Sequence, residues 1–179
     1  PPALIRHGKQ LGPNHGDETN EGLSESIGPG AVHLGVENIE KVGAIGVPGY
    51  GWEVKIVNDE GNEVEKGEVG ELCLKGDGVM KCYYKNPEAT RDVLTLDGWL
   101  YTGDLAYADK DGYVFICGRK KNVIVLKNGK NVYPEEIEVL ISNLEYVEEC
   151  MVFGQPRKAD DPIDLAVCLK VVYKPDVMK

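Results

Sequence analysis

Apolar and polar residues alternate along much of the middle of the chain, with the period of two that is typical of half-buried strands. Apolar residues flank the charged Lys55 on both sides, and a second apolar run covers Val69–Leu74. Turn-forming residues at 59–62 and 65–68 separate these segments. Short strands at close intervals with glycine-rich turns predict a small sandwich or a distorted barrel.

Two segments have helical signals instead. Asn86 can cap a helix and Pro87 suits a first helical turn, so a short helix is expected there. Pro134 predicts the start of a second helix, with acidic residues in its first turn, where they suit the helix dipole. Apolar residues then recur at the helical spacing i, i+3, i+4, i+7 on one face: Ile137, Leu140, Ile141 and Leu144.

After this second helix the pattern returns to strands. Cys150–Phe153 and Leu165–Tyr173 are predicted strands, and the polar segment Val152–Asp164 between them, with two prolines, is expected to form an exposed loop. A helix followed by strands makes an α+β unit. The predicted fold class is therefore α+β, a small distorted β-barrel subdomain followed by a small α+β C-terminal domain.

Charge and composition exclude several classes of protein. The 179 residues carry a net charge of −10, from 20 Lys+Arg and 30 Asp+Glu. This balance argues against a surface for nucleic acid or for an anionic membrane. No apolar run approaches the roughly 18 residues of a membrane span, and no secretory leader is visible, so a cytoplasmic location is expected.

The cysteines and histidines carry no candidate chemistry. Five cysteines are widely spaced and form no metal-ligand pattern. Four of them lie in apolar, strand-like runs, which predicts buried, reduced thiols. The three histidines all lie in the N-terminal fifth, away from any candidate nucleophile, and are interpreted as incidental.

A carboxylate and a guanidinium flank a predicted hairpin. Asp104 follows Gly103, Arg119 ends an apolar run, and Asp109–Gly112 supplies turn residues between them. A carboxylate can accept hydrogen bonds from two vicinal hydroxyls, and an arginine can bind a phosphate through two N–H groups. Ribose and phosphate together indicate a nucleotide site.

The motifs around this hairpin resemble those of the acyl-adenylate-forming enzymes, which include acyl-coenzyme A synthetases, adenylation domains and luciferases. The resemblance covers about Val42 to Phe153. It rests on motifs in the family's order and spacing: Thr102-Gly103-Asp104, Gly118-Arg119-Lys120-Lys121, Asn128-Gly129, and Pro134-Glu135-Glu136-Ile137-Glu138. The sequence of residues 121–134 resembles the fatty-acyl branch of the family more than the peptide-synthetase branch.

The resemblance implies a domain organisation. Residues 1–40 would be the end of a large ATP-binding domain, 41–120 a β-barrel-like subdomain, and 121–179 an incomplete C-terminal α+β domain, with the hinge at Lys121. The expected ligands are ATP or AMP, Mg, coenzyme A and a carboxylic acid, which is expected to be a fatty acid.

The resemblance also assigns roles to residues. Asp104 would hold the ribose hydroxyls and Arg119 the ribose and phosphate. Ser24 would approach the phosphate and Glu25 would help to hold magnesium, although a plain loop explains both residues as well. Lys121 would be the hinge, and the loop at 128–129, Asn128 and Gly129, would close on the pantetheine arm. The family's aromatic residue before Gly22 is replaced by Glu21, which puts adenine stacking there in doubt.

Two family parts are missing from the 179 residues. The Ser/Thr/Gly-rich phosphate loop ending in Pro-Lys-Gly is absent, and no Gly-Lys pair stands near the C-terminus for the catalytic lysine. The chain is therefore expected to be part of a longer acid–thiol ligase, cut at both ends, that needs the remainder of that enzyme for catalysis. The alternative is a non-catalytic module that uses the same fold for binding or regulation.

Overall fold

The computed structural model describes residues 19–20, 23–26, 31–33, 41, 43–158 and 160–175. The chain divides into two compact units, Pro1–Ile116 and Cys117–Lys179. Each unit is described by itself. Expectations for Glu21 and Gly22 lie outside the described residues, and the expected boundaries at 40 and 120 stay predictions.

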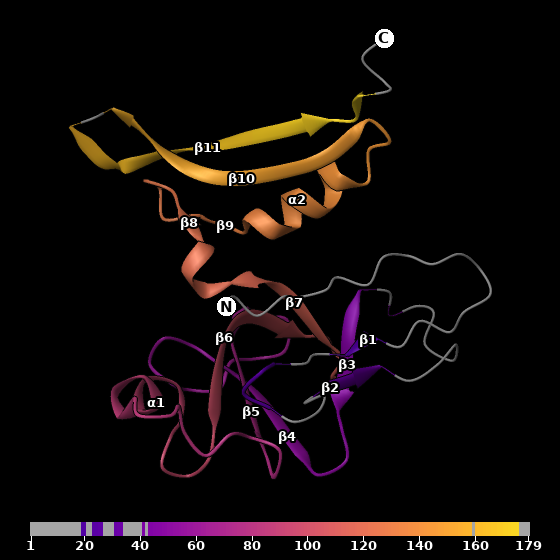
Figure 1. The fold of residues 1–179 in the computed structure, drawn as a ribbon, viewed down its shortest axis with the longest axis vertical. Helices are drawn as coiled ribbons and strands as arrows, with labels where there is room; N and C mark the ends of the chain where they lie inside the picture. The colour runs from indigo at the N-terminus through magenta and orange to yellow at the C-terminus, as the bar shows by residue number, and fades with distance from the viewer. Residues whose placement is uncertain are drawn as a thin grey trace. The chain divides into compact units, whose positions relative to one another are not determined.

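The first unit is built around one curled sheet that forms an open half-barrel (Figure 1). Its strand order is β1-β2-β3-β7-β6-β5-β4, and the pairs β4–β5 and β5–β6 are antiparallel. The elements are β1 Thr19–Asn20, β2 Ala31–His33, β3 Ala44–Pro48, β4 Trp52–Val57, β5 Gly70–Gly76, α1 Pro87–Val93, β6 Leu100–Ala108 and β7 Val114–Arg119, whose last residues belong to the second unit.

The core of this unit lies on the inner face of the sheet. Leu72 and Leu74 of β5 have exposed fractions of 0%, and Leu100 of β6 has one of 1%. Each contributes about 1.5–3 kcal/mol relative to an exposed leucine. The same cluster also contains Leu23, Ile56, Ala106 and Val114. The alternation that predicted strands thus records which side chains face this core.

Local signals position the connections of this unit. The Asn86 side chain accepts a hydrogen bond from the Ala89 N–H at 3.1 Å and caps α1, as predicted. Asp109 Oδ1 accepts from the N–H groups of Asp111 and Tyr113, both at 2.9 Å, and so forms the turn between β6 and β7. The Lys41 ammonium contacts both aspartates, which lowers the pKa of Asp109 below its usual range.

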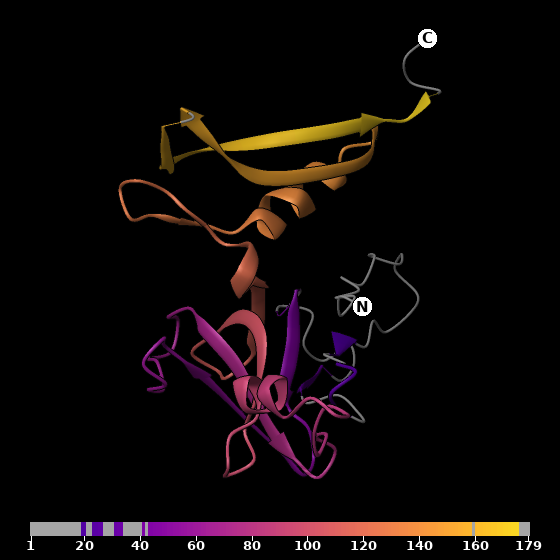
Figure 2. The ribbon, with the colours of Figure 1, turned by 60° about the vertical axis from the view of Figure 1, so that its left-hand side comes forward.

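The second unit is a long hairpin with one helix against it (Figure 2). The antiparallel strands β10 Val147–Lys158 and β11 Asp161–Tyr173 form the hairpin, and α2 Pro134–Ser142 packs on β10. A small hairpin of β8 Ile124–Val125 and β9 Asn131–Val132 precedes the helix. One curled sheet and one α+β unit confirm the predicted fold class.

One expectation for the second unit is corrected. The predicted loop Val152–Asp164 is wrong, because β10 continues to Lys158 and β11 begins at Asp161. Both strands of a two-stranded hairpin are edge strands, and a proline that lacks an N–H is tolerated on the unpaired edge of such a strand. The apolar face of α2 is only partly covered: Leu140 is 69% exposed, and Pro134 is the buried residue of the helix.

The structure also gives the state of the cysteines and the character of the helices. All five cysteines are free, and Cys73 and Cys117 are buried, whereas Cys82 is exposed and Cys150 and Cys168 are half-buried. Burial, and after it the negative charge of Glu136, raises the pKa of the Cys117 thiol to about 11. Within the described residues, neither helix has the length and apolar character needed to cross a membrane.

Candidate nucleotide site and hinge

The Thr102-Gly103-Asp104 motif forms a bulge in the middle of β6. Glu71 of β5 pairs with Leu105, and Cys73 pairs with Tyr101. Between these two pairs β5 has one residue and β6 has three, so β6 carries two extra residues here. Gly103 adopts a φ of 74°, a conformation that favours glycine.

The bulge preserves the alternation of the strand because it contains an even number of extra residues. A one-residue insertion would turn the following side chains to the opposite face of the sheet. With two, the buried positions stay in phase on both sides of the bulge: Leu100, Thr102, Asp104 and Ala106. The motif therefore places its carboxylate on the core side of the sheet.

Residues of β5 satisfy the backbone groups that the bulge displaces. The Thr102 hydroxyl donates to the Leu72 carbonyl at 2.9 Å and accepts from the Asp104 N–H at 3.1 Å. The Glu71 carboxylate accepts from the Gly103 N–H at 3.2 Å. Glu71 was not among the predicted site residues, since its role depends on the register between two strands.

The carboxylate of Asp104 lies in the interior of the unit. Its exposed fraction is 1%. A buried carboxylate is costly unless polar partners compensate it, which makes this an unusual place for a residue that only forms a turn.

Removing the Glu71 side chain is expected to destabilise the bulge. Glu71→Ala leaves the Gly103 N–H without its acceptor, which should lower the free energy of unfolding by about 1–3 kcal/mol. Glu71→Gln retains a side-chain oxygen and should lose less. Urea unfolding of the 179-residue chain measures both, with the exposed Glu63→Ala as the control. Equal stability of Glu71→Ala and Glu63→Ala would contradict this role for Glu71.

Ser24 and Glu25 lie in a turn that is tied to the segment after β5. The Glu25 carbonyl accepts from the Met80 N–H at 2.7 Å, and its carboxylate accepts from the Tyr83 hydroxyl at 2.9 Å. Burial and then this hydrogen bond raise the pKa of Tyr83 above its usual value. Ser24 is exposed. Sequence reasoning missed Tyr83, which is 58 residues from Glu25.

Glu25 fits magnesium only as a single carboxylate ligand. Among residues 19–20, 23–26, 31–33, 41, 43–158 and 160–175, no three His, Cys, Asp or Glu side chains are grouped to hold a metal ion. Proteins commonly bind Mg²⁺ through one or two carboxylates together with substrate phosphates, and Glu25 is consistent with that mode.

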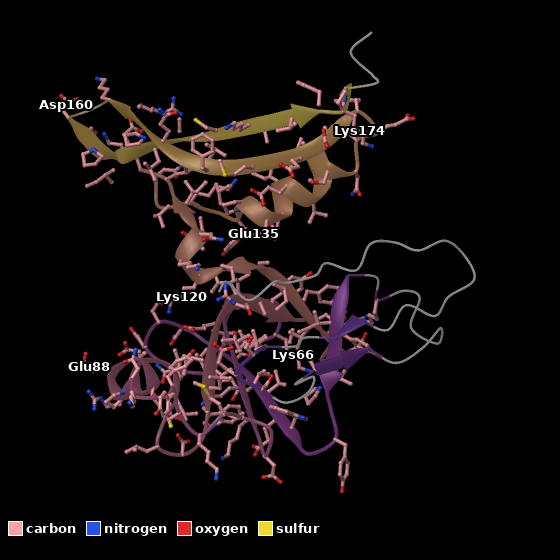
Figure 3. All side chains as sticks on the ribbon, in the orientation of Figure 1. Lys66, Glu88, Lys120, Glu135, Asp160 and Lys174 are labelled. Carbon is pink, nitrogen blue, oxygen red and sulfur yellow. The ribbon has the colours of Figure 1, made fainter. Side chains whose placement is uncertain are left out.

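The predicted hinge lies in the second unit, after the last strand of the half-barrel sheet. Arg119 is the final residue of β7, as expected for a strand end, and its side chain is half-buried. A 3₁₀ turn follows at Lys120–Asn122, and Lys121 at its centre is exposed. Figure 3 labels Lys120 in this turn and Glu135 in the helix that follows. Asp104 belongs to the first unit.

Asn128 and Gly129 form the tip of the β8–β9 hairpin. The Gly129 N–H donates to the Leu126 carbonyl at 2.8 Å, and Asn128 Oδ1 accepts from the Lys130 N–H at 3.0 Å. Gly129 has a φ of 80°, and no atom lies within 4 Å of where a Cβ would be. Turn geometry therefore explains the glycine, and the space beside it is open.

Two family models match the chain. One, described as AMP-binding enzyme, matches residues 3–84, and the other, described as AMP-binding enzyme C-terminal domain, matches residues 121–160. The two matches fall on either side of the segment that contains Asp104 and Arg119.

Curated relatives align over most of the chain. The long-chain-fatty-acid–CoA ligase of Salmonella typhimurium is 46% identical over 132 residues, 74% of this chain and 23% of the relative. The feruloyl-CoA synthase of an Amycolatopsis species is 40% identical over 75% of this chain and 27% of the relative. The sulfoacetate–CoA ligase of Cupriavidus necator is 38% identical over 77% of this chain and 27% of the relative. The chain thus spans about a quarter of the length of these relatives.

Solved structures show the same fold. The O-succinylbenzoate coenzyme A synthetase of Bacillus subtilis in complex with AMP superposes with a TM-score of 0.79 at 31% identity, covering 88% of this chain and 31% of that one. The same enzyme in complex with ATP and a magnesium ion gives a TM-score of 0.78 at 31% identity, covering 87% of this chain and 31% of that one. Together with the two family matches, these alignments show that the chain belongs to the AMP-binding enzyme superfamily.

Proposed function

We propose that this chain works as part of an ATP-dependent acid–thiol ligase, called here the parent enzyme. The Thr102–Asp104 bulge is the observation that carries the proposal. Its Thr102 hydroxyl and Gly103 N–H donate hydrogen bonds to β5 and so hold the segment that carries a buried carboxylate, in a chain of the AMP-binding superfamily. A carboxylate with this support is suited to accept hydrogen bonds from the two ribose hydroxyls of a nucleotide.

The proposed reaction has two halves. A carboxylate oxygen attacks the α-phosphate of ATP and releases pyrophosphate, which leaves an acyl-adenylate. The thiol of coenzyme A then attacks the acyl carbon and releases AMP, which leaves a thioester. Positioning of the reactants and neutralisation of charge are the protein's main contributions to both halves.

Each site residue has one proposed task. Asp104 holds the ribose, Arg119 contacts the ribose and a phosphate, and Ser24 donates to a phosphate. Glu25 is the proposed ligand of magnesium, which neutralises phosphate charge when it is bound. The hairpin tip at 128–129 approaches the pantetheine arm of coenzyme A, where the open space beside Gly129 allows close contact.

The proposed acid is a fatty acid. The relative that acts on long-chain fatty acids is 46% identical, against 40% and 38% for those that act on feruloyl and sulfoacetate substrates. Competition between palmitate, ferulate and sulfoacetate in the parent enzyme tests this choice. The value of kcat/KM should be highest for palmitate, and a preference for either other acid would contradict it.

The 179 residues alone are expected to be inactive in adenylation. They lack the phosphate loop and the lysine that, by family resemblance, neutralise the polyphosphate. Carboxylate-dependent exchange of labelled pyrophosphate into ATP is the assay. The parent enzyme should exchange label and the isolated chain should match the blank. Exchange by the pure chain would contradict this prediction, and no exchange by the parent enzyme would favour a non-catalytic module.

A further inference from the structure

Glu135, in the first turn of α2, contacts the hinge segment on both sides of Lys121. One carboxylate oxygen, Oε1, accepts from the Asn122 side-chain amide at 2.6 Å and from the Arg119 backbone N–H at 3.4 Å. The same atom therefore joins a residue before the hinge to a residue after it. Glu135 was expected only to suit the helix dipole.

The second carboxylate oxygen of Glu135, Oε2, occupies the space beside Gly118 where a side chain would begin. A Cβ at Gly118 would stand 2.4 Å from Oε2 and 3.0 Å from Cδ, so only a glycine leaves room for the carboxylate. Oε2 is buried, and it has no hydrogen-bond partner among the described residues. A buried carboxylate oxygen without a partner is unfavourable, so the hydrogen bonds through Oε1 are opposed by a cost at Oε2.

These contacts cannot survive a rotation about Lys121. Gly118 and Arg119 precede the hinge residue, whereas Glu135 follows it on α2. A change in the backbone dihedrals of Lys121 moves α2 relative to the residues before the hinge, because α2 is carried by the chain beyond it. Rotation must therefore break the hydrogen bond to Arg119 and lift the carboxylate from Gly118.

We propose that Glu135 is a positioning residue of the hinge, a clamp that holds residues 118–122 in one geometry and releases them when the parent enzyme changes between half-reactions. The hydrogen bonds through Oε1 stabilise one geometry of the hinge, and the unpaired Oε2 lowers the free energy needed to leave it. The catalytic part of this inference rests on the proposed function, whereas the existence of the clamp does not.

The clamp itself is tested in the 179-residue chain by amide hydrogen exchange at Arg119. Glu135→Ala removes the acceptor and should speed exchange by about tenfold. Glu135→Gln keeps an oxygen and should stay within about threefold. Glu136→Ala, which removes an exposed charge from the same helical turn, is the matched control and should change nothing. Unchanged exchange in Glu135→Ala would overturn the proposal.

The role in catalysis is tested in the parent enzyme by measuring the two half-reactions separately. Glu135→Ala should change the ratio of the adenylation rate to the thioester-forming rate by about tenfold. Glu135→Gln should keep this ratio close to that of the unsubstituted enzyme. Gly118→Ala, whose Cβ would displace the carboxylate, should shift the ratio in the same direction. The double variant should add nothing further, because both changes open the same clamp.

Two results would count against this role. If Glu135→Ala lowers both half-reactions by the same factor, Glu135 supports the fold and does not position the hinge. If the unsubstituted parent enzyme forms no acyl-adenylate, the proposed function fails and the catalytic part of the inference fails with it. Exchange at Arg119 still decides whether the clamp exists, so the two failures are distinguishable.

Discussion

Lys121→Pro in the parent enzyme is expected to separate the two half-reactions, so that one survives and the other falls by about two orders of magnitude or more. Lys121 is the central residue of the 3₁₀ turn Lys120–Asn122. The φ range of such a turn, about −50° to −70°, includes the value of about −65° that proline imposes. Proline also disfavours a helical conformation at the preceding residue, Lys120, which belongs to the same turn.

Proline at 121 therefore admits at most one of the two hinge geometries, because it fixes φ at about −65° and also constrains Lys120. Rapid-mixing measurements of acyl-adenylate formation, and of thioester formation from pre-formed adenylate, give the two rates. Lys121→Ala is the control, because it removes the exposed side chain and leaves the backbone free to rotate. Equal loss in both steps, with an unchanged circular dichroism spectrum, would leave Lys121 without a hinge role.

Asp104→Ala in the parent enzyme is expected to weaken nucleotide binding and adenylation together. The loss of two charge-assisted hydrogen bonds to the ribose hydroxyls should cost on the order of 2–4 kcal/mol of binding free energy. Calorimetric titration with a non-hydrolysable ATP analogue measures the change.

The interior position of Asp104 calls for two controls, because a substitution in the core can also destabilise the fold. Asp104→Asn keeps the shape and one acceptor oxygen, and should lose less affinity than alanine does. Thermal unfolding of each variant shows whether the sheet is intact. An unchanged dissociation constant in a folded Asp104→Ala enzyme would mean that the carboxylate serves only the bulge.

Local chemistry made several elements predictable from the sequence. The Asn86 cap, the turn at Asp109–Gly112 and the start of α2 at Pro134 each depend on residues within one turn of each other. Apolar runs made β4 and β5 readable as strands, although both faces carry buried residues, as the adjacent Leu72 and Cys73 show. Such signals predicted the fold class correctly.

Features that depend on distant partners were not predictable. The bulge at Thr102–Asp104 exists only in the register of β6 against β5, and nothing in the motif itself reveals it. Tyr83 meets Glu25 across the first unit, and Glu135 looks like an ordinary acidic residue of a first helical turn. Pro156 indicated a loop, although a long two-stranded hairpin tolerates it.

The residues alone indicated a nucleotide site, and the family resemblance supplied the hinge and the roles of single residues. The structure then gave these residues a physical setting: a bulge held by β5 around Asp104, and a 3₁₀ turn held by Glu135 around Lys121. The roles assigned to Ser24, Glu25 and Arg119 stay predictions.

Transfer of oxygen from the acid to AMP tests the central claim most directly. The parent enzyme is supplied with a fatty acid that carries ¹⁸O in both carboxylate oxygens, with ATP and coenzyme A, and the AMP is examined by mass spectrometry. Attack by the carboxylate on the α-phosphate, followed by cleavage at the acyl carbon, predicts one ¹⁸O in each AMP and one in each thioester. Label in inorganic phosphate, or AMP without label, would contradict an acyl-adenylate.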